Sequence, residues 1–361
     1  MCYLFRIVLS AMIFGVAGAS VASERAEATC EMVQTPQYAY LANMNDDMVS
    51  VLDISTMQTV DQIEGFDSPY GIVSMPDESR IYVDNASKLV RKKRYVAVVD
   101  SCTRKIVKKI PVSTMLPVSA ISKDGSTVYV AEVATKHVLR VDTATDEIVR
   151  TYSVPELIAV AIPSHQNDTL WIGTIFGHIY TVSTDTGLTV GKPIKVPWSV
   201  GWLSFTPDGK KLISVHAGPG IVSVIDVATR EVLASLDMGK GSFPEYGAVS
   251  PDGLFYWVAL GNGKVKVIDL QTNSELITLE AGEFSFGVRL SPDGHRAFVT
   301  TVPHGSNLIT ENAAILTFLL LGGFWNPAGE IVIYDTTTFE EIDRVPTAAS
   351  PTIMSYAGAE G

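Results

Sequence analysis

Cysteine and positive charge are scarce in this chain of 361 residues. Its three cysteines are too few for a disulfide-dense scaffold and lack the paired CxxC spacing of a structural zinc site. Lysine and arginine number 27 against 39 aspartates and glutamates, which gives a formal charge of −12. Because such a chain repels a phosphate backbone, we expect no nucleic acid partner.

The common catalytic and cofactor motifs are missing as well. The sequence has no HExxH, GxSxG or P-loop pattern, and its glycine-rich runs fall in turns. No apolar run is long enough to cross a bilayer. We therefore expect no cofactor, no resident metal and no stable membrane insertion. With 47% hydrophobic and 18% charged residues, the composition is that of a globular protein with a sizeable core.

The first residues follow the pattern of a secretory signal peptide. Arg6 precedes a short apolar stretch at 7–16, and small residues lead up to Ala22. This pattern predicts a leader at 1–22, an N-terminal segment at 23–35 and a secreted protein. The two Asn-X-Ser/Thr sequons, at Asn85 and Asn167, predict N-glycosylation if the source is eukaryotic.

Removal of the leader would take Cys2 with it and leave an even pair, Cys30 and Cys102. In an oxidising compartment a disulfide between them is the default expectation. Two buried, unpaired thiols are the alternative.

A repeat is the strongest pattern in the chain. An apolar strand ends in Asp, or once in Ser, and Thr follows after two intervening residues. The pattern occurs seven times, at Asp53, Asp100, Asp142, Ser183, Asp226, Asp269 and Asp335. The period is near 43 residues, with one long interval of 66 before the last copy. Such a period, with several short strands per unit and tight Pro-Asp-Gly turns, indicates propeller blades.

The ends of the chain complete the count of blades. Residues 38–43 read as a second strand without a first, and residues 351–356 as a first strand without a second. Pairing between them would close the ring and remove exposed strand edges. The sequence thus predicts an all-β, seven-bladed β-propeller over 36–361, closed by its N- and C-terminal strands.

The units resemble the YVTN-type propeller repeat over about residues 36–358. Its signature strand appears in altered form as Tyr40-Leu41-Ala42-Asn43, Tyr82-Val83-Asp84-Asn85 and Phe298-Val299-Thr300-Thr301. The resemblance is specific for fold. It is weak for function, because this frame carries enzymes, binding modules and surface proteins.

The predicted site lies where the inner strands begin, since these strands line the central channel. Their starts are rich in aromatic residues, and segment 303–327 contains an apolar stretch that we interpret as a helical lid over this mouth. An edge helix packed on neighbouring blades is the alternative for that segment. The predicted substrate-binding residues are Tyr70, Glu132, Trp198, Trp202, Phe243, Tyr246, Phe286 and Trp325. The predicted catalytic residues are His216, His304 and Glu245.

A secreted YVTN-like propeller with these features is similar to the fungal hetero-Diels-Alderases of tropolone-sesquiterpenoid biosynthesis. The resemblance implies a pericyclase that joins a tropolone-derived quinone methide to a humulene-type sesquiterpene. In that reading His304 or His216 would bond the forming oxygen centre or assist loss of water, and the aromatic residues would stack on hydrophobic small-molecule substrates. A non-catalytic binding or surface propeller and a metal-dependent, lactonase-like hydrolase remain open. The oligomeric state is not predicted.

Overall fold

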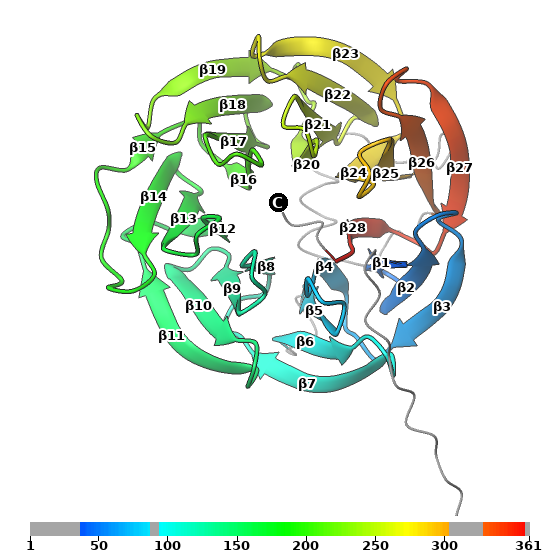
Figure 1. Cartoon of the computed structure of the whole chain (residues 1–361), viewed down its shortest axis with the longest axis horizontal. Helices are drawn as coiled ribbons and strands as arrows, with labels where there is room; N and C mark the ends of the chain where they lie inside the picture. Colours follow the sequence, from blue (N-terminus) through cyan, green and yellow to red (C-terminus); the bar gives the residue numbers. More distant parts are fainter. Residues whose placement is uncertain (1–36, 87–93, 303–327, 358–361) are drawn as a thin grey trace, which may run out of the picture.

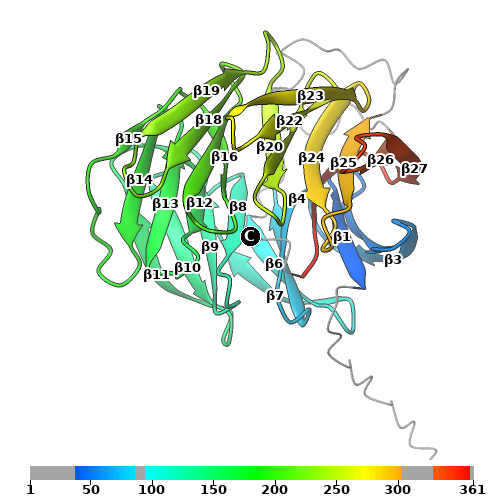
Figure 2. The ribbon, with the colours of Figure 1, turned by 45° about the horizontal axis from the view of Figure 1, so that its top comes forward.

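The chain folds into a ring of seven four-stranded antiparallel sheets (Figure 1). The computed structural model describes residues 37–86, 94–302 and 328–357. Within these ranges there are strands and turns but no helix. Figure 2 shows the ring tilted, with the inner strands arranged around its axis. The prediction of an all-β, seven-bladed propeller is confirmed.

Each blade runs from an inner strand at the axis to an outer strand at the rim. The first blade contains β28 (Pro351–Ser355), β1 (Tyr38–Asn43), β2 (Met48–Asp53) and β3 (Thr59–Glu64). The second contains β4 (Pro69–Ser74), β5 (Arg80–Asn85), β6 (Tyr95–Asp100) and β7 (Lys105–Pro111). The third contains β8 (Pro117–Ile121), β9 (Thr127–Glu132), β10 (His137–Asp142) and β11 (Glu147–Ser153). The fourth contains β12 (Ile158–Pro163), β13 (Thr169–Thr174), β14 (His178–Ser183) and β15 (Ile194–Lys195).

The remaining three blades follow the same order without interruption. The fifth contains β16 (Val200–Phe205), β17 (Lys211–His216), β18 (Ile221–Asp226) and β19 (Val232–Asp237). The sixth contains β20 (Pro244–Val249), β21 (Phe255–Leu260), β22 (Lys264–Asp269) and β23 (Ser274–Glu280). The seventh contains β24 (Phe284–Leu290), β25 (Arg296–Val302), β26 (Gly329–Asp335) and β27 (Glu341–Thr347).

The two ends of the chain meet in the first blade. Strand β1 pairs antiparallel with β28, and Tyr40 lies opposite Ser355. The blade therefore combines three N-terminal strands with one C-terminal strand, as the sequence predicted. This pairing covers the edge of β1 that faces the axis.

All seven predicted Asp or Ser positions end the third strand of a blade. Asp226 shows why the repeat contains Thr, because its Oδ1 accepts hydrogen bonds from the Thr229 backbone N–H at 2.7 Å and the Thr229 hydroxyl at 3.0 Å. The carboxylate thus organises the turn that leads to the outer strand.

Tyrosines of the second strands connect neighbouring blades. The Tyr82 hydroxyl donates to Asp146 Oδ1 at 2.5 Å, and the Arg80 guanidinium pairs with the other carboxylate oxygen at 2.7 Å. In the next blade the Tyr129 hydroxyl donates to Asn167 Oδ1 at 2.7 Å. Apolar side chains fill the space between the blades, and Trp257 is among the largest that are fully buried. These contacts fix the ring that surrounds the axial channel.

Candidate functional site in the axial channel

β-Bulges near the start of the inner strands help to shape the channel wall. In the ladder between β4 and β5 the register skips one residue, Tyr70. The ladders of β16, β20 and β24 are irregular in the same place. The residues at these irregularities are Tyr70, Gly201, Glu245, Tyr246 and Phe286. Since a bulge re-aims side chains, it accounts for the fact that all five line one cavity.

This cavity, here called the Glu245 cavity, lies at the start of the inner strands and has a volume of about 50 Å³. Its described wall consists of Tyr70, Val118, Gly201, Trp202, Glu245, Tyr246, Phe284, Phe286, Thr352 and Ile353. Five of the residues predicted from sequence are therefore brought together here: Tyr70, Trp202, Glu245, Tyr246 and Phe286. Their roles in binding or catalysis stay predictions.

An aromatic pair borders the Glu245 cavity along the axis. The rings of Trp202 and Tyr246 lie 4.1 Å apart between centroids, at an angle of 40°. The guanidinium carbon of Arg289 lies 4.4 Å from the centroid of the Tyr246 ring, a cation–π contact. Arg289 is held in place by a hydrogen bond from its Nε to the Met354 carbonyl at 2.9 Å.

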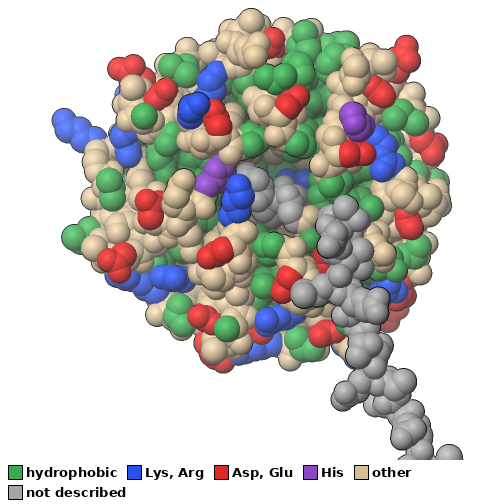
Figure 3. Space-filling model, in the orientation of Figure 1, with side chains coloured by type: hydrophobic (Ala, Val, Ile, Leu, Met, Phe, Trp, Pro, Cys, Tyr) green, Lys and Arg blue, Asp and Glu red, His purple; other side chains and the backbone are tan. Residues whose placement is uncertain are grey.

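A larger cavity, here called the Arg289 cavity, lies on the other side of this pair. Its volume is about 320 Å³, and it is bounded by the ends of the inner strands and the turns that follow them. Ile121, Ile162 and Leu203 contribute apolar wall, and Trp202 and Tyr246 belong to both cavities. A volume in this range suits a small organic ligand. Figure 3 shows one face of the ring, where hydrophobic side chains, a basic side chain and a histidine lie around its centre.

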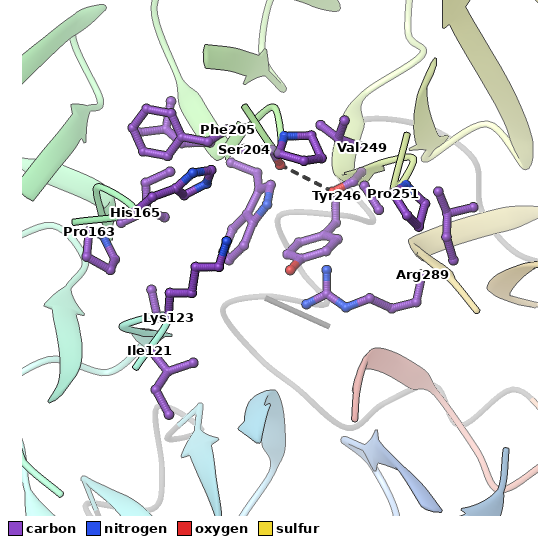
Figure 4. Close-up of a pocket in the computed structure, with 18 of the residues that line it drawn as sticks. Ile121, Lys123, Pro163, His165, Ser204, Phe205, Tyr246, Val249, Pro251 and Arg289 are labelled. Carbon is purple, nitrogen blue, oxygen red and sulfur yellow. Dashed lines mark hydrogen bonds between the residues drawn. The ribbon is translucent and has the colours of Figure 1, made fainter. Parts of the chain in front are cut away.

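Three side chains of the basic amino acids, Lys123, His165 and Arg289, line the Arg289 cavity. Lys123 and Arg289 extend toward it from opposite sides (Figure 4). His165 packs edge-on against Phe205, with 5.6 Å between ring centroids. Burial, and then the charge of Lys123, lower the pKa of His165, so the imidazole is neutral at pH 7. The cavity therefore combines apolar and aromatic walls with two positive charges.

The described wall of the Glu245 cavity, in contrast, has no positively charged side chain. Glu245 is its one charged lining residue within the described part of the chain. Burial raises the pKa of Glu245 to about 8, so the carboxyl group is largely protonated at neutral pH. Burial also raises the pKa of Tyr70, with a further contribution from the negative charge of Glu245.

Four predicted site residues lie away from both cavities. His216 has no exposed surface, and its Nε2 is 3.0 Å from the Ser223 hydroxyl of the same blade. Glu132 is 4% exposed and accepts a hydrogen bond from the Ser113 backbone N–H at 2.5 Å. Trp198 is 57% exposed and covers Gly218. Phe243, which precedes β20, is half-buried against Gly261.

These positions correct the expectation that all the aromatic and polar residues near the strand starts would form one mouth. The structure gives His216 and Glu132 interior packing positions, because their side chains turn into the blade rather than toward the axis. The two remaining residues, His304 and Trp325, lie outside the described residues, as does the predicted lid at 303–327. Val302, the last described residue before that segment, pairs with Phe284 at the end of the ring that holds the Glu245 cavity.

The predicted modification sites have different environments. Asn85 has no exposed surface, and its amide nitrogen, the atom that would carry a glycan, donates to the Val83 carbonyl at 3.1 Å. The folded structure leaves no space for a glycan at Asn85, and glycosylation there stays a prediction. Asn167 is half-buried in a turn, and its glycosylation stays a prediction. Cys102 is disulfide-bonded; Cys2 and Cys30 lie outside the described residues, so pairing with Cys30 also stays a prediction.

Of the residues that line the Arg289 cavity, sequence reasoning found Trp202 and Tyr246 but missed Lys123, His165 and Arg289, because it placed the site at the start of the inner strands. One feature of the sequence could have pointed to Arg289. Glu245 and Arg289 are the two charged residues in the seven inner strands. A charge inside a strand that is otherwise apolar marks a place where the wall meets something polar. Lys123 and His165, in contrast, belong to turns whose proximity depends on the closed ring.

Comparison with known proteins supports the fold. A family model described as a domain of unknown function (DUF5074) matches residues 17–196. No curated protein matches the chain. Hydrazine synthase from Kuenenia stuttgartiensis is similar in structure, with a TM-score of 0.64, 21% identity, and coverage of 76% of this chain and 95% of that one. Dihydro-heme d1 dehydrogenase NirN, in complex with DHE, has a TM-score of 0.60 and 18% identity, and the match covers 90% of this chain and 76% of that one.

The described residues contain no cluster of three or more His, Cys, Asp or Glu side chains that could hold a metal ion. Across the same ranges, no helix is long and apolar enough to cross a membrane.

Proposed function

We propose that this propeller binds a small amphipathic organic anion in the Arg289 cavity. The observation that carries the proposal is the cavity of about 320 Å³ in which apolar and aromatic walls converge with Lys123 and Arg289. The apolar body of the ligand would lie against Trp202 and Tyr246, and its anionic group between the two cations. The chain as a whole carries a charge of −12, so the two cations make the cavity locally positive on a negatively charged protein. This local positive charge would orient the ligand with its anionic group toward Lys123 and Arg289.

The test uses 8-anilinonaphthalene-1-sulfonate, a fluorescent probe with an aromatic body and one negative charge. We expect saturable binding that Lys123→Gln weakens about 5- to 10-fold, which corresponds to roughly 1 to 1.4 kcal/mol. Lys210→Gln is the matched control, because Lys210 follows the equivalent turn of another blade, pairs with Asp208 at 3.4 Å and does not line the cavity. Ala248→Phe, which places a ring in the cavity, should abolish binding. Equal affinity in all three variants would disprove the proposal.

A second candidate is the pericyclase activity that the resemblance to fungal hetero-Diels-Alderases implies. The Glu245 cavity, at about 50 Å³, is too small for a sesquiterpene, and the larger volume of the Arg289 cavity supports assigning this chemistry there. The cycloaddition forms one C–C and one C–O bond and has no leaving group. Arg289 would donate to the quinone methide oxygen, where negative charge develops, while Trp202 and Tyr246 hold the reactants in a reactive pose.

This candidate is tested by incubating the protein with a tropolone-derived quinone methide precursor and humulene. We expect a faster reaction and a single stereoisomer, both lost in Arg289→Met and retained in Lys210→Gln. A product mixture identical to that formed without protein would exclude the activity.

Secretion through residues 1–22 is a further part of the proposal. Expression in a eukaryotic secretory host, followed by N-terminal sequencing of the exported protein, should show a mature chain that begins near residue 23. Treatment with an endoglycosidase should remove at most one glycan, from Asn167, because Asn85 is enclosed in the fold.

A further inference from the structure

The carboxyl group of Glu245 faces the axial channel with no partner of its own. No described residue donates a hydrogen bond to it or forms an ion pair with it, yet it remains partly accessible through the cavity. Burial is the one cause that raises its pKa. A carboxylate in such a place is stabilised by whatever cation enters the cavity.

Aromatic rings make up much of the surrounding wall. Trp202 and Tyr246 form one close pair, and Phe284 and Phe286 form another, with 4.6 Å between ring centroids. Tyr70 supplies a fifth ring and lies near enough to Glu245 for its pKa to be raised by that charge. The faces of aromatic rings carry partial negative charge and attract cations, above all those with methyl groups.

Two other charged side chains lie near the Glu245 cavity, Asp84 and Arg289. Asp84, which also acts on Tyr70, accepts hydrogen bonds from the backbone N–H and the hydroxyl of Ser119 at 2.8 and 2.6 Å. Arg289 lies over the Tyr246 ring and lines the other cavity. The wall segments from β8, β16, β24 and β28 contribute no titratable side chain.

An inorganic cation fits this wall poorly. Ca²⁺ takes six to eight oxygen ligands and Mg²⁺ a near-ideal octahedron. The described wall has one carboxylate and three hydroxyl groups, those of Tyr70, Tyr246 and Thr352. A volume of about 50 Å³ matches a few water molecules, each of which needs roughly 10 to 15 Å³, or one compact organic head group.

We propose that the Glu245 cavity binds the methylated ammonium group of a small organic cation, which pairs with the Glu245 carboxylate inside a cage of aromatic rings. This site is distinct from the anion-binding cavity of the proposed function and does not depend on it.

The probe is choline, compared by isothermal titration calorimetry with 3,3-dimethyl-1-butanol, its uncharged isostere. We expect choline to bind and the isostere to bind at least tenfold more weakly, because shape is retained and charge is lost. Glu245→Gln should weaken choline binding tenfold or more. Glu64→Gln is the control, since Glu64 is an exposed carboxylate at the end of β3 in the first blade and does not line the cavity.

Proton release provides a readout that a purely structural role of Glu245 would not give. Below the pKa of about 8, the cation must displace the carboxyl proton, so the apparent affinity should fall about tenfold per pH unit. Titrations at pH 6.5 in two buffers of different ionisation enthalpy should show release of close to one proton. The burial that raises the pKa of Tyr70 keeps that phenol protonated over this range.

Gly201→Val covers the case in which Glu245→Gln fails to fold. The nearest atoms to a Cβ at Gly201 are 3.8 Å away, so the side chain fits and fills the cavity. This variant should lose choline binding and keep the binding of 8-anilinonaphthalene-1-sulfonate. No choline binding by the wild type, equal binding by the isostere, or unchanged binding in either variant would overturn the inference, whatever the outcome for the Arg289 cavity.

Discussion

At the residue scale, two buried titratable side chains make opposite contributions to the pH dependence of stability. Burial raises the pKa of Glu245 to about 8, which favours its neutral form in the folded state. Burial lowers the pKa of His216 to about 4, and this too favours the neutral form, with a small opposing effect of the Pro197 carbonyl. The acid therefore opposes folding at high pH and the base opposes it at low pH.

The first prediction concerns Glu245. The unfolded carboxyl group ionises near its usual pKa of 4.5, whereas the folded one stays protonated up to about 8. The free energy of unfolding should therefore fall as pH rises from about 4.5 to 8, by at most roughly 4 to 5 kcal/mol at about 1.4 kcal/mol per unit. Glu245→Gln should flatten this fall. Urea unfolding at pH 5 and pH 8.5 measures the change in the free energy of unfolding between these pH values. An equal change in wild type and variant would contradict the prediction.

The second prediction concerns His216. Its folded pKa of about 4 lies below the usual 6.5, so the unfolded chain takes up a proton first as pH falls. Stability should drop between pH 6.5 and 4, by up to roughly 3 kcal/mol. His216→Gln should start from a lower stability at pH 7, because its bond to Ser223 is altered, but lose less on acidification. Chemical denaturation at pH 7 and 4.5 checks this, with exposed His295→Gln as the reference.

The sequence identified Tyr70, Trp202, Glu245, Tyr246 and Phe286 for a physical reason. Each lies at or next to a bulge at the start of an inner strand, where aromatic residues cluster in the sequence. It could not tell these five from Trp198 or Phe243, which precede β16 and β20. Ser199 and Phe243 have positive φ values of 61° and 44°, so the regular alternation of an extended strand does not extend to these two aromatic residues.

At the element scale, the distance to the neighbouring strand determines whether a glycine in an inner strand can be replaced by a larger residue. Gly247 of β20 lies against β21, where a Cβ would overlap the Trp257 carbonyl and come within 2.6 Å of the Tyr256 ring. A Cβ at Gly201 of β16 would make only ordinary van der Waals contacts, the nearest at 3.8 Å. Both are glycines of inner strands, and the difference between them comes from their neighbours.

The third prediction uses this pair. Gly247→Ala should destabilise the fold by roughly 3 kcal/mol, because backbone and a packed ring cannot move aside cheaply. Gly201→Ala should change the free energy of unfolding by less than about 1 kcal/mol. Thermal unfolding of both variants decides the matter, and similar losses in the two would show that the close approach at Gly247 is not the limiting contact.

The strands themselves were predictable, because the Asp that ends six of the seven third strands, and the Ser that ends the other, recur at a regular interval and act locally. Asp53 Oδ1 accepts the Ser55 backbone N–H at 2.9 Å, a contact that depends only on adjacent residues. The division of the channel into two cavities was not predictable. It depends on the contact between Trp202 and Tyr246, which come from the neighbouring fifth and sixth blades, and no local pattern encodes that contact.

At the scale of the whole molecule, ring closure is the feature on which the other blades depend. Strand β28 pairs with β1 and packs beside β4 and β24, so it connects the first blade to both of its neighbours. Arg289 of the seventh blade also donates to the Met354 carbonyl of β28. The loss of one short strand would therefore open the ring and expose the edge of β1.

The fourth prediction follows from this arrangement. A chain that ends at residue 348 lacks β28, and we expect it to aggregate or to unfold at a clearly lower temperature than the full chain. A chain that ends at residue 357 keeps all 28 strands and should unfold near the full-length temperature. Size-exclusion chromatography and thermal unfolding compare the two, and a monomeric, equally stable 348-residue chain would refute a structural role for the closure.

The pairing of β1 with β28, in which Tyr40 lies opposite Ser355, also determines the order in which the blades can form during translation. A ribosome releases the chain from its N-terminus, so the second to seventh blades can assemble from consecutive segments while translation continues. Strands β1, β2 and β3 emerge from the ribosome first, but β28, the fourth strand of their blade, is synthesised only near the end of translation. The blade that is begun first is thus completed last, and premature termination near the 3′ end of the message would release a nearly full-length product that cannot finish it.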